Sequence, residues 1–155
     1  MIKNEHQWRI SKGKVKNLQT ALKNSANSET KLHPAIKKAM LEGIKSQIKE
    51  LKDEINEYET LKNSHKKLEL TINQLSELPI VLIKARINRG LTQKELAVKL
   101  NLKAQQIQRY ESSNYKSVSF ERLVEMVEVL DLKIKQQIIV GGPKKSEKRI
   151  LCLEK

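Results

Sequence analysis

The side chains between Lys103 and Arg109 are of the types that read DNA bases. The run Lys-Ala-Gln-Gln-Ile-Gln-Arg places Arg109 about one helical turn beyond Gln105, so both can lie on one face of a helix. Gln can bond adenine N6 and N7 in two-pronged fashion, Arg can do the same at guanine O6 and N7, and Ala can touch a thymine methyl. A solvated helix face is the alternative interpretation, because Gln and Arg also favour helices.

Two short helices joined by a tight turn are needed to present this face. Thr92, followed three residues later by Glu95, forms the capping-box pattern of a helix start. Asn101 tolerates the left-handed conformation of a tight turn, and the next helix is expected at about 103–111. The side chains expected to be buried in the two helices are Leu96, Ala97, Leu100, Ile107 and Tyr110. Such a pair is typical of a unit that places its second helix in a DNA groove.

A further helix is expected on each side of this pair. Pro79 suits the first turn of the preceding helix, and Gly90 suits its left-handed end. Ser119 is expected to cap the following helix. The side chains expected to be buried are Leu82, Ile83 and Ile87 in the first of these helices, and Phe120, Leu123, Val124, Val127 and Leu130 in the second.

Residues 82–131 resemble the helix-turn-helix domain of phage repressor and Cro proteins, the XRE family. The matching features are Arg86, Gly90-Leu91-Thr92-Gln93, Glu95-Leu96-Ala97, Ile107 and Glu111. The tract from Leu82 to Gln93, with the later Gln-Arg-Tyr-Glu, also resembles bacterial regulators and HigA-type antitoxins. The resemblance covers about a third of the chain. It implies a fold of small packed helices that binds double-stranded DNA.

The resemblance also assigns roles to individual residues. It implies that Ala104, Gln105 and Arg109 face base edges, and that Gln93 contacts a DNA phosphate. Lys103 and Gln106 would lie towards the flanking backbone, and Arg86 and Glu111 would form a partly buried ion pair. Two departures stand out: Ala104 cannot hydrogen-bond to a base, and the fifth helix usual in the family is not evident after Leu130.

The polar loop that precedes Ser119 offers two further candidates. Lys116 and Ser117 lie where the backbone of such a loop often rests on phosphate. An ordinary surface loop explains these residues equally well.

The apolar pattern of the first 78 residues predicts helices. Ser11 is a candidate cap for a helix that carries Val15, Leu18 and Leu22, and residues 24–28 read as a loop. Pro34 then suits a first helical turn.

The apolar residues that follow form a heptad seam: Leu41, Ile44, Ile48, Leu51, Ile55 and Tyr58. This seam can pair with the helix at 11–23 or with a second copy. We favour a homodimer, because helix-turn-helix proteins commonly read two half-sites.

Two segments have the character of short strands. Residues 67–72 alternate polar and apolar side chains, which favours a strand slightly over a helical turn. Residues 132–140 begin by alternating and end β-branched. Residues 132–155 hold seven Lys and Arg against two acidic residues, and the basic run at 144–149 is either an arm that tracks phosphate or a disordered tail.

Composition narrows the class of partner. The net charge of +13 points to polyanions. The single cysteine, Cys152, excludes an intrachain disulfide and favours a reducing compartment. No apolar run approaches the roughly 18 residues of a membrane span, and the first residues lack the apolar part of a signal peptide. We therefore expect a cytoplasmic, nucleoid-associated protein with no membrane partner.

Catalytic and metal-binding patterns are missing from the sequence. His6, His33 and His65 are scattered, with no Cys or carboxylate at metal-ligand spacing. His33, directly before Pro34, is better explained as part of a helix cap. There is no Gly-rich phosphate loop and no nucleophile elbow. We expect no metal, no cofactor and no enzymatic activity.

The sequence therefore predicts a mainly α fold with short β segments possible. Residues 1–78 are expected to form a helical, coiled-coil-like region for dimerisation or partner binding, 79–132 a repressor-like helix-turn-helix domain, and 133–155 a basic strand or tail. The expected function is a dimeric, sequence-specific DNA-binding transcription regulator. The alternative is an antitoxin that neutralises a cognate toxin and autoregulates its operon.

Overall fold

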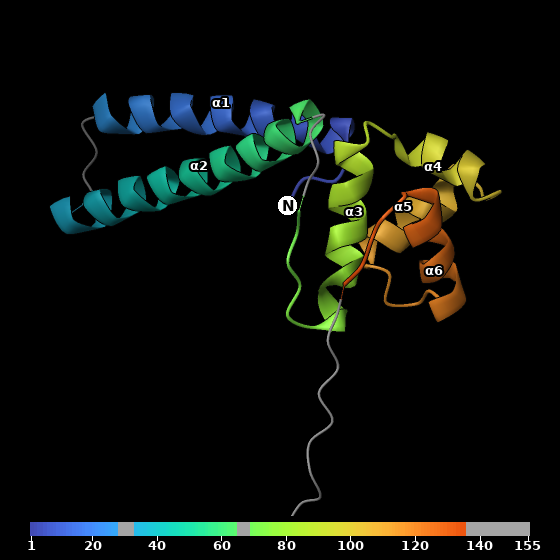
Figure 1. Cartoon of the computed structure of the whole chain (residues 1–155). Coiled ribbons are helices and arrows are strands. Elements are labelled where there is room, and N and C mark those ends of the chain that lie inside the picture. The colour runs from blue at the N-terminus through green and yellow to red at the C-terminus, as the bar shows by residue number, and fades with distance from the viewer. Residues whose placement is uncertain (28–32, 65–68, 136–155) are drawn as a thin grey trace, which may run out of the picture.

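The computed structural model describes residues 1–27, 33–64 and 69–135, and in these ranges it contains helices and no strands. The elements are α1 Glu5–Asn27, α2 Pro34–Asn63, the 3₁₀ turn η1 Leu75–Glu77, α3 Leu78–Asn88, α4 Gln93–Lys99, α5 Ala104–Ser112 and α6 Phe120–Val129. Two long helices form a hairpin that projects from a bundle of four short ones (Figure 1). The mainly α fold is confirmed, with the helix-turn-helix part after the helical N-terminal part.

The hairpin is held together by the heptad seam of α2. Ile48, Ile55 and Tyr58 are buried on α2, and Val15 is buried on α1, where the two helices lie side by side in opposite directions (Figure 1). Pro34 stands at the start of α2, and the His33 ring accepts a hydrogen bond from Ala35 N, as expected of a cap. Of the two pairings open to the seam, the structure shows the one within a single chain.

The limits of α1 differ from those predicted. The helix begins at Glu5, so Ser11 lies inside it and caps nothing. The Asn4 side chain accepts a hydrogen bond from Gln7 N at 2.9 Å, which is the cap interaction. Trp8 Nε1 donates to Glu59 on α2 at 3.0 Å, and this contact supports the added first turns.

The C-terminal end of α1 also lies beyond the predicted limit. The helix continues to Asn27 through residues that were expected to form a loop. Lys37 Nζ on α2 donates to Ala26 O at 3.3 Å, so the neighbouring helix supports the last turn of α1. Residue 28, the last of the predicted loop, lies outside the described residues.

The predicted strands are wrong wherever the structure describes them. Residues 69–72 and 132–135 are neither strand nor helix. A lone alternating segment gains ladder hydrogen bonds only beside a partner strand, and the described ranges hold no strand. Residues 67–68 and 136–155, which include the rest of both predictions, the basic run and Cys152, lie outside the described residues.

The bundle of α3 to α6 contains the best-buried side chains of the described chain. The apolar side chains there that are at most 1% exposed are Leu82, Ile83, Leu96, Ala97, Ile107, Met126 and Leu130. All but Met126 were predicted to be buried, as was Ile87 on α3, which is 4% exposed. Gly90 ends α3 with φ 68°, and Asn101 turns the chain with φ 53°, so both left-handed positions are confirmed.

The buried face of α6 was predicted too wide. Phe120 and Val124 are 63% and 40% exposed, whereas Met126, which the pattern missed, is fully buried. Successive helical residues are about 100° apart, so Val124 points well away from the stripe through Met126 and Leu130. Phe120, four residues before Val124, lies on the same outward face of the helix. An apolar side chain on α6 is therefore not by itself a core residue.

Candidate nucleic-acid interface

The turn between α4 and α5 fixes the geometry of the candidate interface. Asn101, in the left-handed region, lets Leu102 N donate back to Ala97 O at 2.8 Å. This is the bond that closes a helix end of the Schellman type. Only four residues then separate α4 from α5. The start of α5 is therefore held rigidly against α4, as in a unit that presents its second helix to a groove.

The start of α4 is fixed by the predicted capping box. Thr92 Oγ1 accepts from Glu95 N at 3.1 Å, and Glu95 Oε2 accepts from Thr92 N at 2.7 Å. The hydrogen bonds that the Glu95 carboxyl accepts, first from Thr92 N and next from Thr92 Oγ1 at 2.8 Å, hold its pKa below the ordinary value. The backbone N–H groups of Thr92 and Glu95, which have no partner within the helix, are both satisfied by these bonds.

The outward face of α5 carries the side chains predicted to read bases. Ile107 faces the core with no exposed surface, whereas Gln105 and Arg109 are exposed one turn apart. Within the described residues neither exposed side chain has a hydrogen-bond partner. Ala104, at the start of the helix, is half-buried, and it adds only a methyl group to this face. Tyr110 is half-buried rather than fully buried as predicted.

The residues predicted to lie on the DNA backbone are more dispersed. Lys103 and Gln106 are exposed at the start of α5, where the Gln106 side chain accepts from Lys103 N at 2.9 Å. Lys116 and Ser117 are exposed in the loop that precedes α6. Ser119 caps α6 as predicted, by accepting from Arg122 N at 3.3 Å. No hydrogen bond within the described ranges links the loop residues to those at the start of α5.

Arg86 and Glu111 form the expected ion pair, and it is completely buried. Arg86 Nε lies 2.5 Å from Glu111 Oε1, and Nη2 lies 2.9 Å from Oε2. The two side chains are 3% and 0% exposed. Arg86 also donates to Leu91 O, which ties the α3–α4 link to the pair. Buried charges are tolerated because they are paired and because their remaining donors are satisfied.

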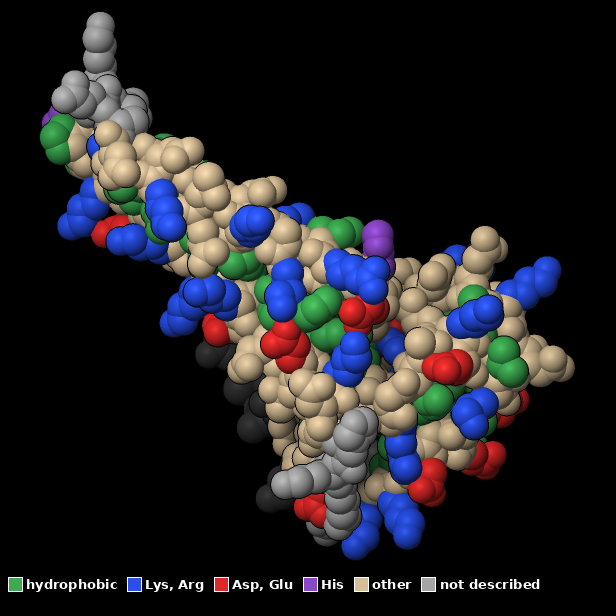
Figure 2. Space-filling view, turned by 90° about the horizontal axis from the view of Figure 1, so that it is seen from above, with side chains coloured by type: hydrophobic (Ala, Val, Ile, Leu, Met, Phe, Trp, Pro, Cys, Tyr) green, Lys and Arg blue, Asp and Glu red, His purple; other side chains and the backbone are tan. Residues whose placement is uncertain are grey.

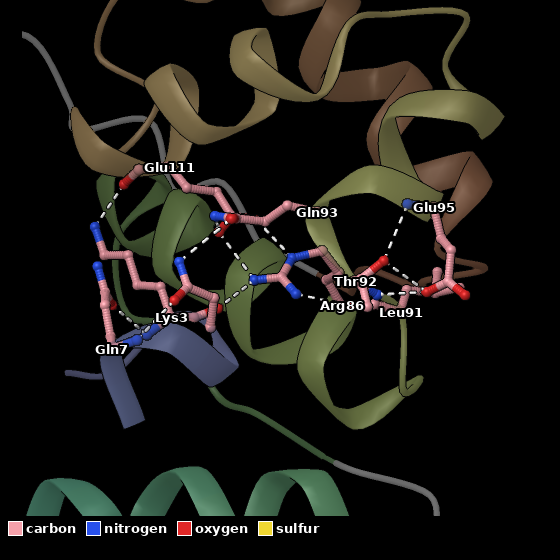
Figure 3. Close-up of polar contacts among 9 residues, drawn as sticks. Lys3, Gln7, Arg86, Leu91, Thr92, Gln93, Glu95 and Glu111 are labelled. Carbon is pink, nitrogen blue, oxygen red and sulfur yellow. Dashed lines mark hydrogen bonds and ion pairs between the residues drawn. The ribbon is translucent and has the colours of Figure 1, made fainter. Parts of the chain in front are cut away.

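Gln93, the predicted phosphate contact, belongs to the same cluster (Figure 3). Its Nε2 donates to Glu111 Oε2 at 2.8 Å, and its Oε1 accepts from Asn4 Nδ2 at 3.3 Å. The structure thus brings Gln93, Arg86 and Glu111 together, but it leaves the α5 residues predicted to read bases outside this network.

Lys3 and Asn4 also belong to the cluster, although neither was predicted from the sequence. The Lys3 carbonyl accepts from Arg86 Nη2 at 2.6 Å, and Lys3 Nζ donates to Glu111 O at 2.5 Å and to Asn114 Oδ1 at 2.7 Å. The one usable signal was Asn4 followed by Gln7, which is a cap pattern. That pattern places a helix start but not its contact with α4.

Residues 1–27, 33–64 and 69–135 contain no group of three or more His, Cys, Asp or Glu that could hold a metal ion. None of the helices in these ranges is both long and apolar enough to cross a membrane.

Comparison with known proteins matches residues 82–136 to a helix-turn-helix family. The match begins within α3, includes α4, α5 and α6, and so contains every residue of the interface except Lys3 and Asn4. No curated protein and no solved structure matches the chain.

Proposed function

Because residues 82–136 are a helix-turn-helix domain of the XRE kind, we propose that this DNA-binding regulator of transcription is a repressor-like dimer that reads a specific sequence. The observation that carries the proposal is the face of α5, where Gln105 and Arg109 are exposed and unpartnered within the described residues beyond a tight turn. In this arrangement α5 enters the major groove, and Arg109 has the reach to form two hydrogen bonds to a guanine.

The surroundings of α5 suit the DNA backbone. Lys103 and Lys116 are exposed on either side of the helix in the sequence, and both supply charge that phosphate attracts. Lys and Arg side chains are spread over the hairpin and the bundle on the face seen in Figure 2. The proposed division of labour is base reading by Ala104, Gln105 and Arg109, and positioning by Gln93, Lys103, Gln106, Lys116 and Ser117.

The proposal is tested by selecting a binding site from random duplexes at fixed salt and then comparing Arg109→Ala with the parent protein. We expect Arg109→Ala to lose about 1–3 kcal/mol on the selected site and much less on random DNA. Fixed salt is needed because charge attraction alone changes steeply with ionic strength.

Arg9→Ala is the matched control for the lost charge. Arg9 is an exposed arginine on α1, and its side chain is 73% exposed. Removing this charge should leave the ratio of specific to random binding unchanged. An equal loss on both kinds of DNA in the Arg109→Ala protein would refute base reading by α5.

The N-terminal region is proposed to join two chains. The heptad seam is already covered by α1, so it offers little to a second copy. Ile36 and Met40 remain 57% and 39% exposed on α2, at the end of the hairpin that is far from the bundle (Figure 1). Apolar side chains one helical turn apart at a projecting end are suited to a helix from another molecule. Residues 1–78 are thus the proposed dimerisation or partner-binding region, and 133–155 a basic tail.

The same exposed end also supports the second candidate function, an antitoxin. In that case Ile36 and Met40 would cover part of a cognate toxin, and the helix-turn-helix domain would autoregulate the operon. A toxin reading frame beside the gene, and co-purification of its product with the chain, would favour this function. A solitary gene would weaken it. Both functions place the protein in the cytoplasm, with the nucleoid.

A further inference from the structure

The segment Lys3–Asn4 closes a ring of polar contacts around the start of α4. The Lys3 carbonyl accepts from Arg86, Arg86 donates to Glu111, and Gln93 also donates to Glu111. Asn4, covalently next to Lys3, completes the ring by donating to the oxygen of Gln93 at 3.3 Å. Lys3, Arg86, Gln93 and Glu111 face one another in Figure 3. The neighbouring Ile2 is 3% exposed, so the segment is anchored on its apolar side as well.

Chemistry decides which way the Gln93 amide faces. The Glu111 carboxylate accepts hydrogen bonds and donates none. The nitrogen of Gln93 must therefore face Glu111, and its oxygen must face Asn4, whose amide nitrogen donates to it. The opposite orientation would set two acceptors against each other at Glu111 and two donors at Asn4.

This orientation leaves a single group of Gln93 available. Its Nε2 carries two N–H groups, and one of them is used by Glu111. Within the described residues no other acceptor takes the second N–H. A DNA phosphate oxygen accepts hydrogen bonds, and a fixed N–H donor can supply one. The clamp from Asn4 and Glu111 thus prepares Gln93 as a donor before DNA arrives.

We propose that Asn4 is a positioning residue of the DNA site, which acts by holding the Gln93 amide so that its remaining N–H is directed to a backbone phosphate. This inference rests on the proposed function and adds to it a residue that lies 89 positions before Gln93 and outside the helix-turn-helix match. Because Asn4 also caps α1, the hairpin and the phosphate contact share one anchoring residue.

The variant Asn4→Ser separates the two roles of Asn4. Ser caps helices about as well as Asn, so the start of α1 is retained, but the shorter side chain cannot reach Gln93. We expect Asn4→Ser in the full chain to weaken binding to the selected duplex and to random duplexes alike, by about three- to tenfold, which is the contribution of one hydrogen bond. Since no charge is lost, the dependence of binding on salt should not change.

A double-mutant cycle with Gln93→Ala tests whether Asn4 acts through Gln93. Gln93→Ala alone should weaken binding to all duplexes, and Asn4→Ser should have no further effect in that background. Unfolding in urea should show that the Asn4→Ser protein is fully folded under the conditions of the binding assay, so that a damaged fold is recognised.

Three results would overturn the inference while leaving the proposed function intact. They are an unchanged affinity in Asn4→Ser, the same loss with and without Gln93, and an unchanged affinity in Gln93→Ala. In each case the sequence preference that depends on Arg109 would persist. A parent protein that binds the selected duplex no more tightly than random DNA would instead refute the proposed function, and the inference with it.

Discussion

At the scale of single residues, the polar interior of the bundle contrasts a satisfied group with an unsatisfied one. Glu111 is fully buried, yet its carboxylate accepts from Arg86 and Gln93. Tyr115 is 3% exposed, and its hydroxyl has no hydrogen-bond partner in the described part of the chain. Leaving a buried polar group unpaired costs about 1–3 kcal/mol. Tyr115 is therefore a position where a small change can improve the fold.

The first residue-scale prediction is that Tyr115→Phe is neutral or stabilising by up to about 1 kcal/mol at neutral pH, because it removes only the unpaired hydroxyl. Burial, and next the charge of Glu111, raise the pKa of Tyr115. The folded protein therefore keeps this proton above pH 10, where the unfolded chain loses it. Tyr115 thus makes the free energy of unfolding fall as the pH rises, by up to about 1.4 kcal/mol per pH unit.

Urea unfolding at several pH values between neutral and 11 measures this difference. The stability of Tyr115→Phe relative to the parent should grow above pH 10, since other titrating groups affect both proteins equally. Tyr110→Phe is the matched control, because Tyr110 lies beside Tyr115, with ring centroids 6.3 Å apart, but is half-buried. A constant difference between Tyr115→Phe and the parent across the pH range would contradict the assigned cause.

At the scale of elements, prediction from sequence succeeded where the cause was local. The cap formed by Thr92 and Glu95, the left-handed Gly90 and Asn101, and the burial of Ile107 all follow from neighbouring residues, and all are present. The interface on α4 and α5 could therefore be assembled before its geometry was known. A short periodic pattern with strong stop signals was sufficient for it.

Prediction failed where the cause was a contact distant in sequence. Asn4 and Ser11 are both good cap residues, and contacts of Glu5 and Trp8 with α2 favour the earlier start of α1. The Lys3 carbonyl that Arg86 binds lies 83 positions away, and every residue carries such an acceptor. A local pattern cannot choose among them. The exposed faces of α6 were missed for a related reason, since periodicity does not say how much of a helix its neighbours cover.

The prediction at this scale concerns the end of α3. Gly90 has φ 68°, and a Cβ added there would meet no atom within 4 Å. Gly90→Ala should therefore lower the free energy of unfolding through backbone strain alone, by about 1–2 kcal/mol. Gly43, inside α2, has equally open surroundings and no positive φ, so Gly43→Ala should stabilise the protein by about 0.5–1 kcal/mol. Urea unfolding measures both changes, and a Gly90→Ala protein that is as stable as the parent or more stable would exclude strain at Gly90.

At the scale of the whole molecule, the hairpin and the bundle are joined at the base of the hairpin. Glu57 on α2 pairs with Lys84 on α3 at 2.7 Å, and Lys3 binds the Arg86–Glu111 pair. Among the residues that the structure describes, the opposite end of the hairpin makes no such contact, and it projects away from the bundle (Figure 1). The hairpin is thus suited to carry an interface at its free end while its base supports the DNA-binding domain.

The last prediction locates the interface of the proposed dimer by comparing two exposed apolar pairs of the same spacing. Ile36 and Met40 lie at the free end of the hairpin, and Phe120 and Val124 lie on α6. If the hairpin end joins two chains, Ile36→Glu with Met40→Glu should turn the dimer into a monomer in sedimentation, because charges would be buried at the interface. The fold should persist, since both side chains are exposed within one chain.

The pair Phe120→Glu with Val124→Glu is the control, with the same change in charge and the same spacing on a helix. It should leave the sedimenting mass at that of a dimer. The opposite result, in which only this pair yields a monomer, would move the interface to α6. In that arrangement the recognition helices would be set by the bundle itself, and the hairpin end would be left for a different partner. If instead the hairpin variant becomes a monomer, its DNA binding should fall steeply, because a monomer reads one half-site rather than two.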